Sequence, residues 1–430
     1  MRVEPDRIAG KVASAARASA PASVPSVPSG TSAAGPPGRS EPSALVTATV
    51  LAVSSLTILA NATIAPSLPG IAAAFAGTPG AEGLAGLALS LPSLSIVLSA
   101  GLFGWLCDRV DPLRVLVVAM TLYAVAGAAG ALAPTMPTLL VGRFVLGFGV
   151  AGTMTVATLL ASRLWEGEAR ARFMGRQFAA TSLVGVFLLV GGGFLAELDW
   201  RAPFLIYLVA LPTALLAWTT LGRSVPRRPA LATRGIAPLA FPWRAFALPG
   251  ALACFTMTVF YLIPTRLPFH LAEIGIPSPS AAGTAVAAVT LAGIPGSLWF
   301  GRLRTRFEPH VIGAASFAVI AAGFVVISLA DTLPFVIAGT LAVGAGLGPS
   351  FPNFMAWLMA RMPDAAKGRA SGLFTVAVFG GQFISPLIGQ FVSDRIGLFL
   401  TFDVFAAALV GAALALLVTA RPRPGSVRSA

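Results

Sequence analysis

Apolar residues occur in uncharged runs of about 20 residues that recur along nearly the whole chain. Coiled as an α-helix, a run of that length crosses the roughly 30 Å hydrocarbon core of a bilayer. Runs bounded by charges or by Gly and Pro clusters predict twelve transmembrane helices. They lie near residues 44–66, 83–105, 114–133, 138–161, 177–197, 202–222, 245–267, 281–300, 310–330, 333–358, 370–392 and 397–420. The predicted fold class is an all-α membrane protein.

The composition supports a membrane protein over a soluble one. Hydrophobic residues make up 56% of the chain and charged residues 10%, against about 25% charged residues in soluble domains. The net charge of +13 could suggest a nucleic-acid partner. Nucleic-acid binding, however, needs that charge gathered on a folded polar surface. Here it is scattered through short connections, so we expect a lipid bilayer as partner and no nucleic acid.

The distribution of basic residues predicts the orientation. Of the 29 Lys and Arg residues, 25 fall in the two tails and in the even-numbered connections. Cytoplasmic segments carry such an excess, so both termini are expected in the cytoplasm. Residues 1–43 lack the apolar core of a signal peptide and are expected to be a disordered cytoplasmic tail, with residues 421–430 as a second tail.

The chain also resembles itself at an offset of 197 residues. The matching pairs are Gly104 with Gly301, Leu106 with Leu303, Arg109 with Arg306, Gly142 with Gly339, Gly147 with Gly344 and Gly149 with Gly346. The repeat predicts two pseudo-symmetric six-helix bundles, 44–222 and 245–420, joined by a basic cytoplasmic linker, 223–244. Duplicated halves around a central site are usual in secondary transporters, which rock one half against the other.

Two motifs carry a family resemblance. GWLCDRVDPLRVL, residues 104–116, resembles the signature after helix two of the major facilitator superfamily, G-x-L-a-D-R-x-G-R-R. Gly104, Asp108 and Arg109 match, Arg114 keeps a basic charge, and residues 111–113 depart. LLVGRFVLGFGVAG is similar to the family's second signature, an Arg within helix four followed by a Gly-rich stretch. The resemblance implies the twelve-helix fold of that family.

The resemblance also implies a role for the first motif. Gly104, Asp108, Arg109 and Arg114 would join a cytoplasmic network between the halves that stabilises the outward-open state. The alternative is a solvated loop at the membrane edge, where charge costs little. Against it, Asp108 aligns with Thr305 in the second half, so the charge is not part of the repeated framework.

Segments such as NATIAPSLPGI and GGQFISPLIG look most like bacterial multidrug and sugar-efflux permeases, a group with arabinose-efflux-like members. The expectation is a monomeric multi-pass protein of the bacterial inner membrane that exports a small organic solute against protons. Drug:proton antiporters usually carry G-x-x-x-G-P-x-x-G-G in helix five, where this chain has Leu188 and Leu189 in place of Gly-Pro. A uniporter or proton symporter is therefore the alternative.

Arg143 is the most informative single residue, because it lies within the fourth span. A guanidinium there costs at least about 2.5 to 3.5 kcal/mol unless it faces a cavity or a partner. It is predicted to contact substrate or to take part in proton coupling. The alternative is an arginine that snorkels to the membrane surface and anchors a helix end.

Other polar residues at membrane depth are candidates for coupling or substrate contact, since such groups usually face the bundle interior. They are Asn61, Tyr261, Arg266, Asn353, Gln382 and Asp403. Each could equally make a helix–helix hydrogen bond. Arg266 is expected to close the outer gate, with recognition of an anion as the alternative, and Asp403 could be an interfacial residue.

An enzyme is not expected. The chain has two histidines and no paired acids within a span, so it lacks a catalytic or metal-binding constellation. The phosphate-binding pattern G-x-x-x-x-G-K-[ST] of a primary pump is absent. We therefore predict no cofactor and no metal, and a small molecule and protons as the transported species.

Overall fold

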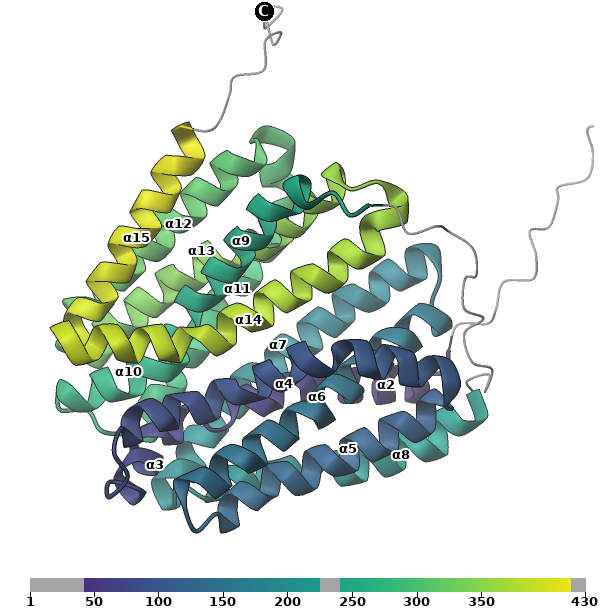
Figure 1. Cartoon of the computed structure of the whole chain (residues 1–430), viewed down its shortest axis with the longest axis horizontal. Coiled ribbons are helices and arrows are strands. Elements are labelled where there is room, and N and C mark those ends of the chain that lie inside the picture. The colour runs from purple at the N-terminus through teal and green to yellow at the C-terminus, as the bar shows by residue number, and fades with distance from the viewer. Residues whose placement is uncertain (1–41, 225–239, 419–430) are drawn as a thin grey trace, which may run out of the picture. The chain divides into compact units, whose positions relative to one another are not determined.

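The computed structural model describes residues 42–224 and 240–418, all in helices or short connections (Figure 1). The predicted tails, apart from residues 42 and 43, and most of the predicted linker lie outside the described residues. The helices are α2 (Ala44–Ala62), η1 (Ala65–Ser67), α3 (Leu68–Ala74), α4 (Ala81–Arg109), α5 (Pro112–Ala128), η2 (Ala129–Leu132), α6 (Met136–Leu164), α7 (Gly167–Leu198), η3 (Ala202–Val209), α8 (Ala210–Ser224), α9 (Trp243–Phe260), α10 (Leu262–Glu273), α11 (Pro279–Arg306), α12 (Pro309–Ser328), α13 (Leu333–Arg361), α14 (Asp364–Ile396) and α15 (Leu398–Val418).

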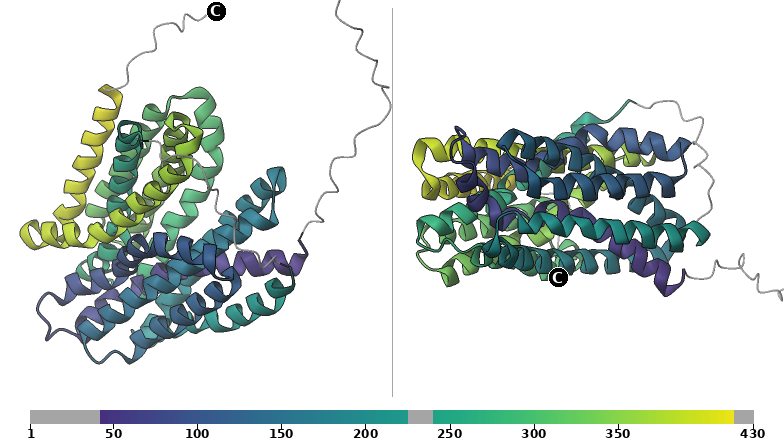
Figure 2. Two further views of the ribbon diagram at one scale, coloured as in Figure 1. Left: turned by 45° about the vertical axis from the view of Figure 1, so that its right-hand side comes forward. Right: turned by 90° about the horizontal axis from the view of Figure 1, so that it is seen from below.

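Within these described ranges, twelve segments are long and apolar enough to cross a membrane, which confirms the predicted number of spans. They run roughly alongside one another (Figure 2). Two spans contain non-helical residues: the first, made of α2, η1 and α3, at residues 63 and 64, and the seventh, made of α9 and α10, at Tyr261. Proline explains the first break, because Pro66 has no N–H to continue the hydrogen bonding of α2.

The departures from the family signature have a local structural role. The Asp111 carboxylate accepts a hydrogen bond from the backbone N–H of Leu113 at 3.1 Å and so caps α5. Pro112 is the first residue of that helix, a position where its missing N–H costs nothing. Asp111 and Pro112 therefore fix the start of α5.

The repeat is visible in the packing. A Cβ atom at Gly147 would meet the Pro92 carbonyl oxygen, and one at Gly344 would meet that of Val289. Likewise, Gly149 packs on the Ala119 carbonyl and Gly346 on that of Ser316. The partners are also 197 residues apart. The same glycine contacts therefore hold the helices of both halves, α2–α8 (the N-terminal half) and α9–α15 (the C-terminal half), at close distance.

The two halves touch mainly near one end of the helices. We call the end where α8 stops and α9 starts the linker end, and the opposite one the far end. At the far end, Gly193 of α7 packs on Pro279 and Ser280 of α11, and Gly83 of α4 packs on Gln390 of α14. Towards the linker end, large apolar side chains of the same four helices are exposed, among them Leu102, Trp105, Phe178, Leu298 and Trp299.

Candidate functional site

Arg143 of α6 forms a polar centre in the N-terminal half. Its side chain is only 1% exposed. Nε donates to the Ala88 carbonyl at 2.8 Å, Nη2 to the Ala60 carbonyl at 2.6 Å, and Nη1 to the Tyr207 hydroxyl at 2.8 Å. The guanidinium thus binds α2, α4 and η3 inside the half rather than reaching towards a membrane surface.

Sequence features free the two carbonyls that Arg143 binds. In a helix the Ala88 carbonyl would accept from residue 92, but Pro92 lies inside α4 and has no N–H. Ala60 is in the last turn of α2, where carbonyls lack helical partners and the helix dipole is negative. Arg143 therefore satisfies backbone acceptors that a proline and a helix break expose.

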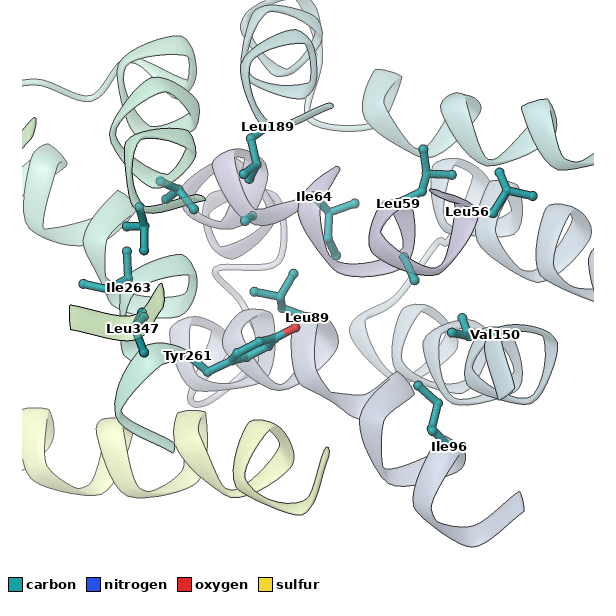
Figure 3. Packing of buried hydrophobic residues seen from close by; sticks show 14 of the residues in the cluster. Leu56, Leu59, Ile64, Leu89, Ile96, Val150, Leu189, Tyr261, Ile263 and Leu347 are labelled. Atoms are coloured by element: carbon teal, nitrogen blue, oxygen red, sulfur yellow. The ribbon is translucent and has the colours of Figure 1, made fainter. Parts of the chain in front are cut away.

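The chain has three tyrosines, and all are buried in this region. Tyr207 also donates to the Ala60 carbonyl at 2.8 Å, and its ring meets that of Tyr123 at 5.6 Å. Tyr123 donates to the Leu56 carbonyl at 2.9 Å. Tyr261 lies at the junction of α9 and α10, where its ring points towards α4 beside Leu89 (Figure 3). The rings form a rigid, largely apolar wall around the arginine.

The positive charge of Arg143 has no carboxylate counter-ion: within residues 42–224 and 240–418, no ion pair involves it. Two carbonyl groups, one hydroxyl and the α2 dipole offset the charge only in part. A buried cation with this environment can attract an anionic group of a ligand or hold a nearby acid in its ionised form.

One buried hydrogen bond joins the halves near the middle of the helices. Ser93 of α4 donates to the Gln382 side-chain carbonyl of α14 at 2.8 Å. The Gln382 amide faces the Met257 sulfur at 3.6 Å, a weak acceptor. The Gln382 side-chain oxygen therefore contacts the opposite half, while its NH2 group has only a weak acceptor.

Arg266 of α10 is also 1% exposed. Its Nη2 donates to the Pro386 carbonyl of α14 at 3.3 Å, and its Nε has no partner among the described residues. Glu82 of α4 and Asp394 of α14 are the acids that act on its charge. Glu82 is in the first turn of α4 and Asp394 near the end of α14, so both acids lie at the far end.

The remaining polar candidates make contacts within one half. Asn353 donates to the Pro309 carbonyl at 2.8 Å, and Asp403 accepts from the Ser328 hydroxyl at 2.9 Å. Both bonds join α12 to another helix of the C-terminal half. The side chain of Asn61 lies outside the described residues.

The residues of the first motif lie at the linker end of α4. The Arg109 guanidinium stacks 4.2 Å from the Trp105 ring centre. Asp108 and Arg114 are exposed, and Gly104 has open space beside its Cα. No hydrogen bond or ion pair in the described part of the chain connects Asp108 or Arg109 to the C-terminal half.

Sequence reasoning missed Glu197, near the end of α7. Its carboxylate accepts from the Ser278 hydroxyl at 2.8 Å, from the Ser280 N–H at 3.4 Å and from the Ser280 hydroxyl. These donors belong to the first turn and cap of α11, where an anion is favoured. It also missed Tyr207 and Ser93; the rarity of tyrosine was the one available signal for the former.

Twelve membrane spans, a repeated packing frame and polar groups between two halves define the architecture of a secondary transporter. The sequence matches the Major Facilitator Superfamily over residues 50–386 and 277–430. The chain belongs to this family, and it is a multi-pass membrane protein.

Individual relatives share a moderate identity. The putative niacin/nicotinamide transporter NiaP of Bacillus subtilis (strain 168) is 28% identical over 133 residues, which cover 29% of this chain and 33% of that protein. The 3-(3-hydroxy-phenyl)propionate transporter of Escherichia coli (strain K12) is 26% identical over 74% of this chain and 79% of its own length. The class C tetracycline resistance protein of Escherichia coli is 27% identical over 76% and 84%, respectively.

The fold itself is similar to that of a D-xylose-proton symporter. The superposition has a TM-score of 0.71 with 17% identity, and it covers 86% of this chain and 96% of that structure. At that identity, the likeness concerns the fold alone. It confirms the predicted arrangement of the twelve helices.

Proposed function

We propose that this transporter exports a small organic solute, a drug-like compound or a sugar, in exchange for protons by alternating access. The observation that carries the proposal is the gathering of contacts between the halves at the far end, where α7 packs on α11 and α4 packs on α14. Alternating access requires such a one-sided contact and a second state in which it is reversed.

The linker end is proposed to face the cytoplasm of a bacterial cell. Exposed arginines gather there, among them Arg109, Arg114, Arg176 and Arg306, and cytoplasmic connections are enriched in Lys and Arg. The arrangement described above is then inward-facing. In the outward-facing state, Asp108 and Arg109 would meet the C-terminal half and close the cytoplasmic side.

Glu197 is the proposed closing contact of the far end. Its carboxylate gathers two hydroxyls and one N–H of α11, and hydrogen bonds to an ionised acceptor are stronger than neutral ones. Because Glu197 and its donors belong to opposite halves, the bonds break whenever the far end opens. They therefore bias the equilibrium between the two states.

Arg143 is proposed to sense substrate or the coupling proton. Its partners include Ala60, at the break of the first span, so a change in charge near the guanidinium would alter the geometry of that break. Export is supported by the likeness to a tetracycline resistance protein, and an organic solute by that to niacin and hydroxyphenylpropionate transporters.

Reconstitution in liposomes tests the proposal. With an imposed pH gradient, tetracycline, niacin, 3-(3-hydroxyphenyl)propionate and xylose would be screened for counterflow. We expect at least one solute to move against the proton flux and to stop when a protonophore collapses the gradient. Movement with the proton flux would support the symport alternative, which Leu188 and Leu189 favour, and movement indifferent to the gradient would support a uniporter.

A further inference from the structure

A membrane-facing crevice in the C-terminal half has no role in the mechanism above. It has a volume of about 250 Å³ and lies between α11, α12 and α13. Its lining includes Leu303, Phe307, Val311, Val319 and Pro349, and Ser316 is the one polar side chain in it. The crevice is therefore an apolar slot that starts near the linker end and runs towards the middle of the helices.

The crevice follows from one difference between the halves. Ala345 forms part of its wall, and the repeat places Phe148 at the equivalent position of the N-terminal half. There the Phe148 ring packs against Phe144 with centres 5.4 Å apart. Because Ala345 lacks a ring, the corresponding space between α11 and α13 stays open.

The open side of the crevice faces away from the N-terminal half. Its α12 wall packs chiefly on α13 and α15, helices of the same half. Ala315, Val319 and Ala345 are exposed on it. In a bilayer, such a slot faces lipid acyl chains. Acyl chains can fill this apolar space, whereas water would find no hydrogen-bond partners in it.

Basic residues are next in sequence to the two lining residues at the linker end of the crevice, Leu303 and Phe307. Arg302, Arg304 and Arg306 are exposed around Leu303 and Phe307 in the last turns of α11. In the described part of the chain, no ion pair or hydrogen bond engages these three guanidinium groups. Glu308 follows them and carries the opposite charge, so this end of the crevice keeps a net positive charge.

The N-terminal half lacks this cluster as well. The positions equivalent to the three arginines hold Trp105, Cys107 and Arg109, and Asp108 stands among them. An apolar slot and a surplus of arginine thus occur together in one half and are both missing from the other. A ligand that has an acyl chain and a negative headgroup matches this combination.

We propose that the crevice binds an anionic phospholipid, with one acyl chain along α12 and the phosphate against Arg302 and Arg306, which lie four residues apart on one face of α11. Arginine suits this role because its planar guanidinium pairs with two phosphate oxygens at once. A lipid bound there would brace α11, the helix that also forms the far-end contact with α7.

The purified full chain in detergent would be titrated with phosphatidylglycerol and with phosphatidylcholine, and bound lipid would be counted by native mass spectrometry. We expect saturable binding of the anionic lipid only. Ala345→Phe, which inserts the ring found in the other half, should abolish it. Arg306→Gln should weaken it roughly fivefold. The matched controls Ala318→Phe, on the exposed face of α12, and Arg176→Gln, at the linker end of α7, should bind as the parent does.

Equal binding of the two lipids would overturn the proposal, because the arginines would then select nothing. Undiminished binding to Ala345→Phe would place the lipid elsewhere. Should Ala345→Phe fail to fold, as judged by thermal unfolding, the lipid affinities of Arg306→Gln and Arg176→Gln still test the proposal, since both changes are at exposed positions. Equal weakening by these two variants would reduce the effect to general surface charge. Displacement of the lipid by inorganic phosphate alone would refute the role of the acyl chain.

Discussion

Position 143 of α6 and position 340 of α13 are equivalent in the two halves, yet their side chains make different contacts. Arg143 reaches backbone carbonyls of α2 and α4. Thr340, fully buried, donates only to the Ile337 carbonyl of its own helix at 2.9 Å. Around both, the glycine contacts are the same. The packing frame is therefore duplicated, whereas at this pair of positions only the N-terminal half carries a buried charge.

The halves also differ in how they satisfy carbonyls freed by proline. In the N-terminal half Arg143 binds the Ala88 carbonyl that Pro92 exposes. In the C-terminal half Pro352 exposes the Gly348 carbonyl, and the Ser297 hydroxyl donates to it at 2.8 Å. A neutral hydroxyl is sufficient for the backbone. We propose that the guanidinium serves transport as well as structure, which the following variants test.

The largest effect is expected at Arg143. Arg143→Ala would leave the Ala88 carbonyl without its donor, at about 1 to 3 kcal/mol. It would also remove one donor each from the Ala60 carbonyl and the Tyr207 hydroxyl, which stay bonded to each other. We expect a lower unfolding temperature and loss of counterflow. Thr340→Ala is the matched control and should cost about 1 kcal/mol with transport retained. Arg143→Lys separates the effect of the charge from that of the guanidinium hydrogen bonds, since it keeps only the charge. Full transport by this variant would assign the function to charge alone. Unchanged transport by Arg143→Ala would remove the residue from the mechanism.

The second largest effect is expected for the paired glycines. Gly147→Ala and Gly344→Ala each push a methyl group into a backbone carbonyl of the neighbouring helix, and overpacking of this kind costs about 1 to 3 kcal/mol. Because the frame is duplicated, we expect similar losses of thermal stability for the two variants. A large loss of thermal stability for one variant and none for the other would show that the helices within the two halves are packed differently.

A smaller effect is expected for Ser93→Ala, which removes the buried hydrogen bond to Gln382 across the halves. A bond of this kind contributes about 0.5 to 1.5 kcal/mol. Ser297→Ala is the counterpart within one half. Ser93→Ala should change the balance between inward and outward states, measured by labelling of single cysteines at either end, while Ser297→Ala should change stability only. The reverse pattern would contradict a role for Ser93 between the halves.

The smallest effect on stability is expected at the far end. Glu197 and Asp394 are equivalent in the repeat, but Asp394 accepts from Gln390 of its own helix. Glu197→Gln weakens a contact between the halves, so cysteine labelling from the far side should become several times faster. Asp394→Asn should leave the labelling rate unchanged. Equal rates for both variants would remove Glu197 from the gate.

Much of the fold followed from the sequence. Hydropathy alone located twelve spans because each helix must pair its backbone groups internally and face lipid with apolar side chains. The role of Asp111 and Pro112 as the start of α5 was also within reach, since a cap and a proline act on neighbours along the chain. The candidate site was less accessible. Arg143 stood out as a charge within a span, but its partners at Ala60 and Ala88 are backbone carbonyls, which look the same at every residue.

By itself, the sequence determined the number of spans, the excess of positive charge on one side and the 197-residue repeat, because each is a pattern along the chain that does not depend on which helices touch. Only the tertiary structure decided that Tyr207 completes the Arg143 centre, that Glu197 meets Ser280 of the other half, and that Ala345 opens a crevice where Phe148 closes one. These contacts depend on which faces of distant helices are turned towards each other. That is fixed by the packing of the whole bundle and leaves no periodic signal along the chain.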